Sequence, residues 1–160
     1  MKKRQIELEY PELDVTITAD LAEDKNPSKC NVLWDNLPLE FIQGHAFSSG
    51  DRMSTHISRI VSDVQNEWAD PRGKFPLLGN WEEKWWGRVP IKRGSIGMSF
   101  KPSFYGIDII YGQMREAIAF APVAQVVDKD IEKLVQVGNA VWEGWMEQKG
   151  YKLIVRRKKK

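Results

Sequence analysis

The stretch from residue 94 to residue 116 constrains the fold most, because it predicts two strands joined by a tight turn. Its first half has apolar residues at every second position, namely Ile96, Met98 and Phe100. This period of two is typical of a half-buried strand. The turn contains Pro102, which fixes its own φ, and Gly106, which is free to adopt a positive φ. The sequence therefore predicts a β-hairpin here.

The second half of this hairpin is a nearly continuous apolar run over residues 107–111, interrupted only by Asp108. Such a run predicts a strand that is central in its sheet, and Gly112 is the expected end of that strand. Polar or reactive groups crowd the exit from the strand: Tyr111, Gln113, Arg115 and Glu116. We therefore expect one wall of any functional site at this position.

Other segments also show periodicity of strands or helices. Strands are predicted over 5–10, 13–19, 39–47 (with Phe41 and Phe47 as anchors), 123–127 and 151–155. Helices are predicted from Asn26 and Pro27 to about residue 36, over 54–68 (with a strand at its start as the alternative), and after a cap at Asp128 or Asp130. The apolar face of the third helix is predicted to contain Ile131, Leu134, Val135, Gly138, Val141, Trp142 and Trp145. Residues 48–52, rich in Ser and Gly, are expected to form a loop.

The single cysteine, Cys30, falls on the apolar face of the first predicted helix and is expected in the core rather than as a nucleophile. It allows no intramolecular disulfide and no cysteine-based zinc site, which fits a reducing compartment. No apolar run approaches the ~18 residues of a membrane span, and the first ten residues lack the apolar segment of a signal peptide. We expect a cytoplasmic protein that is not bound to a membrane.

The formal net charge is only +2, which gives the whole chain no reason to bind nucleic acid. Residues 156–160 are all Arg or Lys and form a basic tail, expected to be a solvated end; a nucleic-acid or membrane arm is the alternative. Residues 1–155 are expected to form a single domain. Within it, 54–90 comprise a helix and a Trp-rich insertion, including Trp81, Trp85 and Trp86, expected to pack as a flap over the domain or over a partner chain.

Strands outnumber helices in this prediction, and they do not alternate regularly with them. This order favours a mainly β (α+β) fold, a barrel or curled sheet of mostly antiparallel strands with peripheral helices.

Four segments resemble a family of small bacterial proteins with a cyclophilin-like closed β-barrel. They are LWDNLP at 33–38, GHAFSSGDRM at 44–53, GSIGMSFKPSFYGIDIIYG at 94–112 and VVDKDIEKLVQVGNAVWEG at 126–144. The family includes cucumopine synthase, which condenses histidine with 2-oxoglutarate by a Pictet-Spengler cyclisation. The resemblance implies a cofactor-free, opine-synthase-like enzyme whose partners are an amino acid and a 2-oxoacid.

Such a condensation needs groups that bind carboxylates and groups that transfer protons. The candidates for proton transfer are His45, Asp108, Tyr111 and Glu116, and those for substrate binding are Ser49, Arg52, Tyr105, Gln113 and Arg115. Each also has a structural interpretation: His45 as a hydrogen-bonded core residue, the tyrosines as packing residues, and Arg115 with Glu116 as a surface ion pair. Asp108 either faces solvent on the outside of the sheet or points into the mouth of the barrel. No metal site is predicted.

Two other functions remain open. One is a non-catalytic protein that binds a small molecule, assembled as a homo-oligomer through the Trp-rich segment. The other is a peptidyl-prolyl isomerase, which is a weaker match because the characteristic Arg-Phe-containing segment of those enzymes is not found.

Overall fold

Eight strands close into one barrel in the computed structural model, which describes residues 3–55, 91–101, 104–115 and 121–159. The strands are β1 (Gln5–Tyr10), β2 (Val15–Leu21), β3 (Leu39–His45), β4 (Gly50–Thr55), β5 (Ser95–Lys101), β6 (Phe104–Met114), β7 (Ala121–Val126) and β8 (Tyr151–Arg157). The helices are α1 (Pro27–Asp35) and α3 (Ile131–Met146), with short 3-10 turns at Pro11–Leu13 and Asp128–Asp130.

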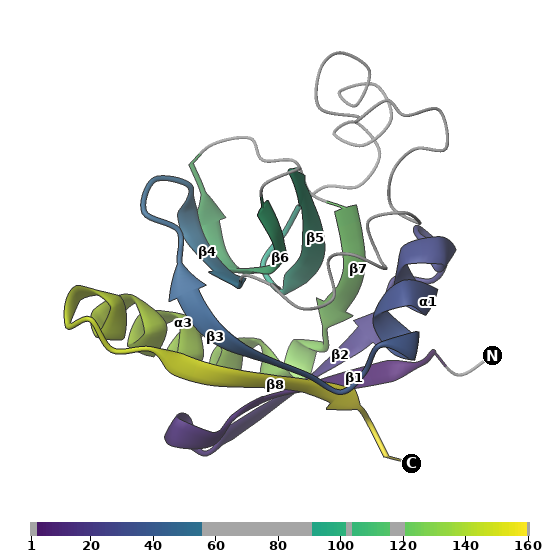
Figure 1. Cartoon of the computed structure of the whole chain (residues 1–160), viewed down its shortest axis with the longest axis horizontal. Coiled ribbons are helices and arrows are strands. Elements are labelled where there is room, and N and C mark those ends of the chain that lie inside the picture. Colours follow the sequence, from purple (N-terminus) through teal and green to yellow (C-terminus); the bar gives the residue numbers. More distant parts are fainter. Residues whose placement is uncertain (1–2, 56–90, 102–103, 116–120, 160) are drawn as a thin grey trace.

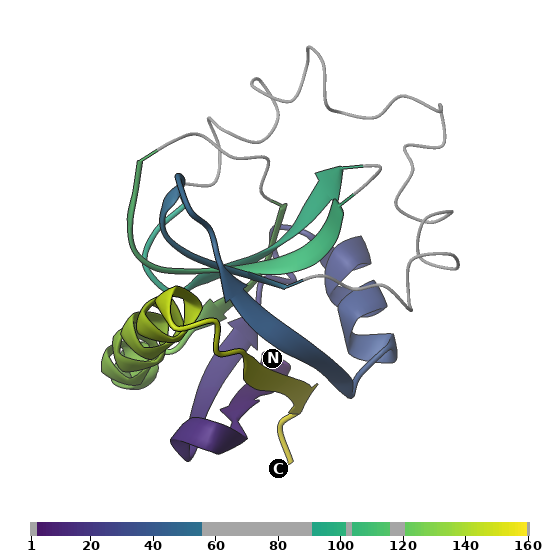
Figure 2. The same cartoon turned by 60° about the vertical axis from the view of Figure 1, so that its left-hand side comes forward.

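The strands follow the order β1-β2-β7-β5-β6-β4-β3-β8 around the barrel, and every neighbouring pair is antiparallel. The closed antiparallel barrel with peripheral helices expected from the sequence is therefore confirmed. Helices α1 and α3 lie on opposite sides of the barrel (Figures 1 and 2). Helix α3 contacts β2, β3, β4 and β6, and α1 contacts β7.

Alternate residues of each strand face a common core, as the pleat of a strand requires. In β3, Leu39, Phe41, Gln43 and His45 are buried, while the residues between them are not. The core is mainly aliphatic, and the buried hydroxyl of Tyr10 within it donates to Oε1 of Gln43 at 3.1 Å. The strand that carries His45 is thus oriented by the burial of its neighbours.

The β-hairpin over 94–116 is confirmed as β5 and β6, and β6 lies between β5 and β4. It is longer than expected, because the second strand continues past Gly112 to Met114. The loop predicted at 48–52 is wrong from Gly50 onward: these residues pair with β6 as β4, and the strand alternative at residues 54–55 is confirmed. Phe47, expected as a buried anchor, lies beyond the end of β3 and is exposed.

Helix α1 begins at Pro27, which occupies the first helical turn as predicted. Asn26 precedes it, but its side chain does not cap the helix; Nδ2 instead donates to the carbonyl of Pro122 at 3.3 Å. Cys30 is fully buried, and its thiol donates to the carbonyl of Val123 at 3.2 Å. These two contacts fasten α1 to β7, and they confirm Cys30 as a core residue.

Helix α3 follows Asp130, whose side chain also makes no cap: Oδ2 accepts from the backbone N–H of Thr18 at 2.9 Å and so connects the helix to β2. The buried face of α3 consists of Leu134, Val137, Gly138, Val141 and Gly144. Trp142 and Trp145, which were predicted on that face, are exposed instead.

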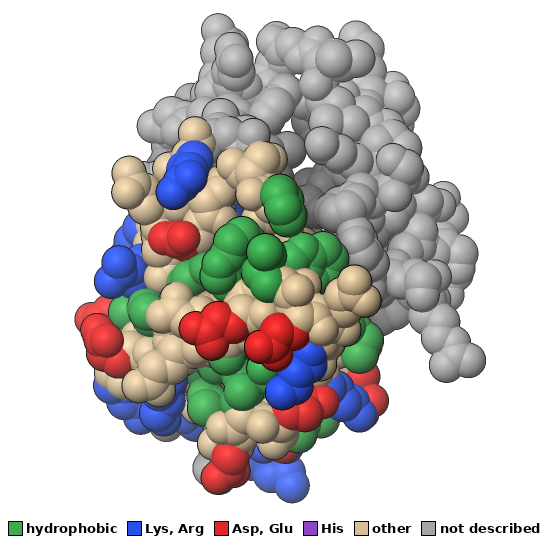
Figure 3. All heavy atoms as spheres, turned by 90° about the vertical axis from the view of Figure 1, so that its left-hand side faces the viewer, with side chains coloured by type: hydrophobic (Ala, Val, Ile, Leu, Met, Phe, Trp, Pro, Cys, Tyr) green, Lys and Arg blue, Asp and Glu red, His purple; other side chains and the backbone are tan. Residues whose placement is uncertain are grey.

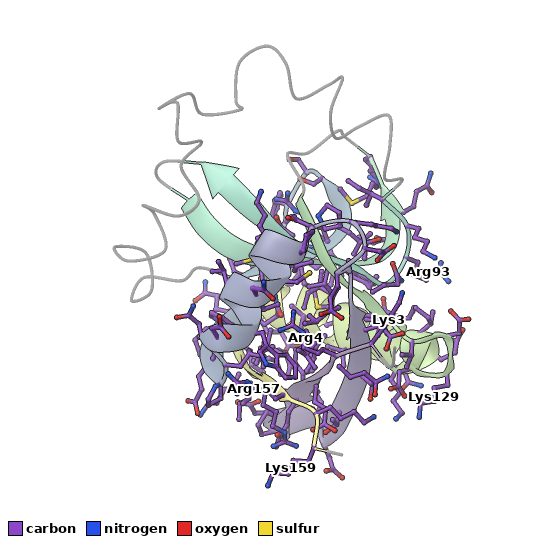
Figure 4. All side chains as sticks on the ribbon, turned by 90° about the vertical axis from the view of Figure 1, so that its right-hand side faces the viewer. Lys3, Arg4, Arg93, Lys129, Arg157 and Lys159 are labelled. Atoms are coloured by element: carbon purple, nitrogen blue, oxygen red, sulfur yellow. The ribbon has the colours of Figure 1, made fainter. Side chains whose placement is uncertain are left out.

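The first two residues of the basic tail, Arg156 and Arg157, are part of strand β8. Arg156 pairs with Glu7 at 3.0 Å, and Arg157 donates to the carbonyl of Trp34 at 2.8 Å. The N–H of Lys158 donates to the carbonyl of Gln5 at 2.9 Å. Figure 4 shows Arg157 beside α1 and Lys159 beyond the end of β8. The solvated end predicted for 156–160 is therefore wrong for residues 156–158, which are attached to the barrel by these contacts.

The predicted helix beyond residue 55 and the Trp-rich insertion at 70–90 lie outside the described residues. Among the helices that are described, none combines the length and the apolar character needed to cross a membrane.

Candidate functional site

Strand β6 presents its side chains to two opposite faces of the sheet. Ile107, Ile109 and Tyr111 belong to the main core cluster. Asp108 and Ile110 alternate with them and therefore point to the outer face of the sheet. Both are nevertheless buried, and Asp108 is only 1% exposed. The outer face of β6 thus carries a buried carboxylate, which is a costly arrangement unless that group is paired.

Among the described residues, Arg52 is a cationic partner of Asp108. In the antiparallel pairing of β4 with β6, Ser54 lies opposite Asp108 and Arg52 lies opposite Ile110, so Arg52 is the diagonal neighbour of Asp108 on the same face. Its Nε lies 3.7 Å from Oδ1 of Asp108, and its side chain is mostly buried. At this distance the two charged groups form an ion pair, but the two atoms are too far apart for a hydrogen bond. The Nε atom of Arg52 is buried, and it has no hydrogen-bond acceptor among the described residues.

Small residues flank Asp108 on both neighbouring strands. Its cross-strand neighbour on β4 is Ser54, and the one on β5 is Gly97, which has no side chain. Neither can cover the carboxylate as a larger residue would. Beside them, Ile110 packs with Ile91 and Met114 in an apolar cluster separate from the main core. A buried ion pair, small neighbours and an apolar wall can together bind a small molecule that is both charged and apolar.

His45 and Tyr111 form a second polar pair, on the core side of the sheet. The Nδ1 atom of His45 lies 2.8 Å from the carbonyl of Ala46, which can only accept, so Nδ1 carries the proton. The Nε2 atom of the neutral ring then accepts from the hydroxyl of Tyr111 at 2.8 Å. The edge of the ring packs against Trp142, with 4.7 Å between ring centroids.

Burial shifts the protonation of this second pair toward the neutral forms. It lowers the pKa of His45 below its ordinary value, because the charged imidazolium loses hydration. It also raises the pKa of Tyr111 to about 12, and the negative charge of Asp51 adds to that rise. Since both nitrogens of His45 have partners, the arrangement matches the structural interpretation of this residue, and its catalytic role stays a prediction.

Asp51 was not recognised as a site residue from the sequence. It lies at an irregularity in the pairing of β4 with β6, where Asp51 alone on β4 stands opposite three residues of β6, numbers 111–113. Its Oδ2 accepts from the N–H of Gln113 at 2.8 Å. A Cβ at Gly112 would overlap the same carboxylate, so a glycine is required there.

Three of the remaining predicted residues, Ser49, Gln113 and Arg115, lie near the start of β4 and the end of β6. Ser49 is buried, and its carbonyl accepts from the N–H of Arg115 at 3.0 Å. The side chains of Gln113 and Arg115 are exposed at the end of β6. Tyr105 lies in β6 opposite Phe100, but its side chain, like the whole of Glu116, lies outside the described part of the chain.

The structure therefore divides the predicted site into two groups. Arg52 and Asp108 are together on the outer face, and His45 and Tyr111 are together on the core face. Asp108 lies on the outer face of the sheet, as the first alternative has it, but it is buried there and does not face solvent. Ser54 and Gly97 were missed, although the alternation of small residues at 95–99 was a signal that could have indicated Gly97.

No group of three or more His, Cys, Asp or Glu side chains that could hold a metal ion occurs within the described residues.

The barrel is similar to two solved structures. One is McbB in complex with tryptophan, with a TM-score of 0.66 and 28% sequence identity. The alignment covers 97% of this chain but 45% of McbB, so the chain spans less than half the length of that protein. The other is the solution structure of hypothetical protein AF2241 from Archaeoglobus fulgidus, with a TM-score of 0.53, 13% identity, and coverage of 98% of this chain and 95% of that one. This second likeness shows the fold alone.

No protein-family model matches the sequence, and no curated protein matches it either.

Proposed function

We propose that this chain is a cofactor-free enzyme that condenses an amino acid bearing an aromatic heterocycle with a 2-oxoacid, by a Pictet-Spengler cyclisation at Arg52 and Asp108. Histidine and 2-oxoglutarate are the substrates that the family resemblance suggests. The observation that carries the proposal is the buried ion pair on the outer face of β4 and β6, flanked by small residues. Buried charges of this kind are concentrated at functional sites, because they rarely stabilise a fold.

The likeness to McbB in complex with tryptophan supports an amino acid as the ligand. Tryptophan and histidine share the features that the reaction requires. Each has an α-amino group that can form an imine and an electron-rich ring on Cβ whose carbon can attack that imine to close a six-membered ring. Either amino acid is therefore a chemically reasonable substrate, and the 2-oxoacid supplies the carbonyl carbon.

The two charged residues have complementary tasks in this reaction. The guanidinium of Arg52 would bind a substrate carboxylate, for which its planar donors are well suited. The amine and the ketone first form an iminium ion with loss of water. A ring carbon then attacks the iminium carbon, whose π electrons move to nitrogen, and Asp108 accepts the proton that leaves the attacked ring carbon. The proposed roles of His45 and Tyr111 as proton carriers would require substrate to reach the core face, and they stay predictions.

The test is product analysis by mass spectrometry after incubation with 2-oxoglutarate and either histidine or tryptophan. We expect a product with the summed mass of both substrates minus one water, formed faster than without protein. Asp108→Asn should lower kcat by about 10²–10⁴-fold, the usual contribution of a general base. Arg52→Met should raise KM for the 2-oxoacid.

Asp24→Asn is the matched control, because Asp24 is exposed and distant in sequence from both strands of the site. It should leave the rate unchanged. The proposal is refuted if no amino acid and 2-oxoacid pair gives a product above the uncatalysed rate, or if Asp108→Asn retains full activity.

A second candidate is a non-catalytic protein that binds an amino acid. The same pair favours it, because Arg52 could bind the carboxylate and Asp108 the ammonium group of a zwitterion. Saturation at 100 times the dissociation constant would add about 2.7 kcal/mol of stability. A rise in melting temperature with an amino acid, without product and without acceleration of prolyl isomerisation in a peptide, would favour this candidate.

A further inference from the structure

The large hydrophobic side chains exposed in the described part of the chain gather on one face of the molecule. They are Ile42 at 67% exposed, Phe47 at 76%, Trp142 at 37%, Trp145 at 47% and Met146 at 64%. Ile42 and Phe47 come from β3 and the loop that follows it, and the other three come from the last two turns of α3. Figure 3 shows hydrophobic side chains gathered on this side of the molecule. We call these five residues the α3–β3 patch.

Packing holds the aromatic members of the patch in place. Trp145 lies over Gly44, where a Cβ would be 3.4 Å from Cζ3 of the indole. Trp142 packs against His45, and Phe47 lies 6.3 Å from Trp142 between ring centroids. Because His45 is itself held by Tyr111, these rings rest on ordered groups. A surface that is already ordered loses little side-chain entropy when a partner covers it.

The size of the patch corresponds to that of a protein interface. An aromatic side chain offers about 150–250 Å² of surface, so the exposed fractions of these five residues amount to several hundred Å². A standard interface takes about 800 Å² from each partner, and the patch would form most of its apolar centre. Its Trp, Phe and Met content is also the composition enriched at interface cores.

We propose that the α3–β3 patch is the interface at which two copies of this chain form a two-fold symmetric dimer. Charges of both signs lie beside it, as a surface that pairs with a copy of itself requires. Glu143 and Glu147 are exposed on the same end of α3, and Lys149 follows directly after the helix. Two copies of the patch, related by a two-fold axis, would together supply most of the apolar area of a standard interface, and the glutamates and the lysine at its edge could pair between the copies.

A membrane is a poorer occupant for this surface. Segments that lie on membranes combine their apolar face with Lys and Arg, which are attracted to anionic lipid. Here, the charges next to the two tryptophans are mainly acidic, because Glu143 lies on α3 and Glu147 is the residue that follows the helix. This interface is distinct from the one predicted for the Trp-rich segment at 70–90, and it does not depend on the proposed enzyme activity.

The experiment measures the mass of the full chain in solution by sedimentation over a range of concentrations. We expect the wild-type chain to have twice the mass of a single chain. Phe47→Asp should weaken the dimer roughly 30-fold or more, the effect of losing a central anchor. Gln136→Asp is the matched control, because it adds the same charge at an exposed position on the same helix. Gln136 precedes Trp145 by about two and a half helical turns, so it lies on the opposite side of α3. It should leave the dimer intact.

Phe47 is the most exposed member of the patch, so its substitution should not disturb folding; circular dichroism and thermal melting check this. Met146→Lys, at the end of α3, is a second variant with the same expected loss of dimer. A wild-type chain that stays monomeric at the highest concentration tested overturns the proposal and assigns the patch to a different protein. A dimer that persists in both folded variants overturns it as well.

Discussion

The ion pair between Arg52 and Asp108 makes a quantitative prediction about stability. At 3.7 Å, two unit charges attract each other by about 4.5 kcal/mol if the effective dielectric constant is about 20. Asp108→Asn removes this attraction and leaves a mostly buried guanidinium without it. Breaking a buried pair in this way costs about 3–5 kcal/mol, and we expect the lower end because Arg52 retains some exposure. At about 2–4 °C per kcal/mol for a domain of this size, the melting temperature should fall by roughly 6–12 °C.

A double-mutant cycle by urea unfolding separates the pair from other effects of the substitutions. The cycle compares Asp108→Asn, Arg52→Met and the double variant, and the double variant should lose about 2–3 kcal/mol less than the sum of the single variants. Asp24→Asn, an exposed substitution of the same kind, should change the free energy of unfolding by less than about 0.5 kcal/mol. If the coupling between positions 52 and 108 is below about 0.5 kcal/mol, the two charges do not interact as described and the reasoning fails.

Three further predictions concern the rest of the barrel. Burial lowers the pKa of His45 below 6.5, so as the pH falls the imidazole is protonated in the unfolded chain before it is protonated in the folded one. The free energy of unfolding should therefore decrease as the pH drops below 6.5, and His45→Gln should flatten this dependence in melting experiments. Gly138→Ala should lower the free energy of unfolding by about 1–3 kcal/mol, although Ala favours helices, because the added methyl group would overlap the ring of Tyr111. Removal of residues 156–160 should cost about 2 kcal/mol in urea unfolding through lost hydrogen bonds, whereas removal of 159–160 should cost almost nothing.

The barrel could be predicted because its strands alternate cleanly, but the grouping of the site could not be taken from proximity in sequence. Asp108 and Tyr111 are three residues apart in one strand, so the period of two places them on opposite faces. The prediction grouped them as residues near the strand exit. Counting the alternation from the core residue Ile109 would have separated them.

Arg52 shows a limit of local sequence patterns. Ser48 to Arg52 have the composition of a turn, and nothing local indicates a strand. The pairing of β4 with β6 is a contact between segments more than fifty residues apart, and it overrides that local preference. Only this register places Arg52 beside Asp108.

The face of α3 was misjudged for a different reason. Hydrophobic periodicity counts Trp142 and Trp145 as core residues, and the predicted face included Gly138 but not Gly144. In the structure, Gly138 packs against Tyr111, and Gly144 packs against Tyr151. Glycines permit this close approach of the helix to the barrel, which turns the tryptophans outward.

The position of β8 between β1 and β3 has a consequence for synthesis of the chain on the ribosome. β8 is made after the other seven strands, yet it completes the ladder between β1 and β3, which come from the first third of the sequence. Until Tyr151–Arg157 has emerged, both strands keep an open edge, and such edges can pair with those of other nascent chains. Closure of the barrel is therefore a late event, and chaperone binding during translation is expected at these two edges.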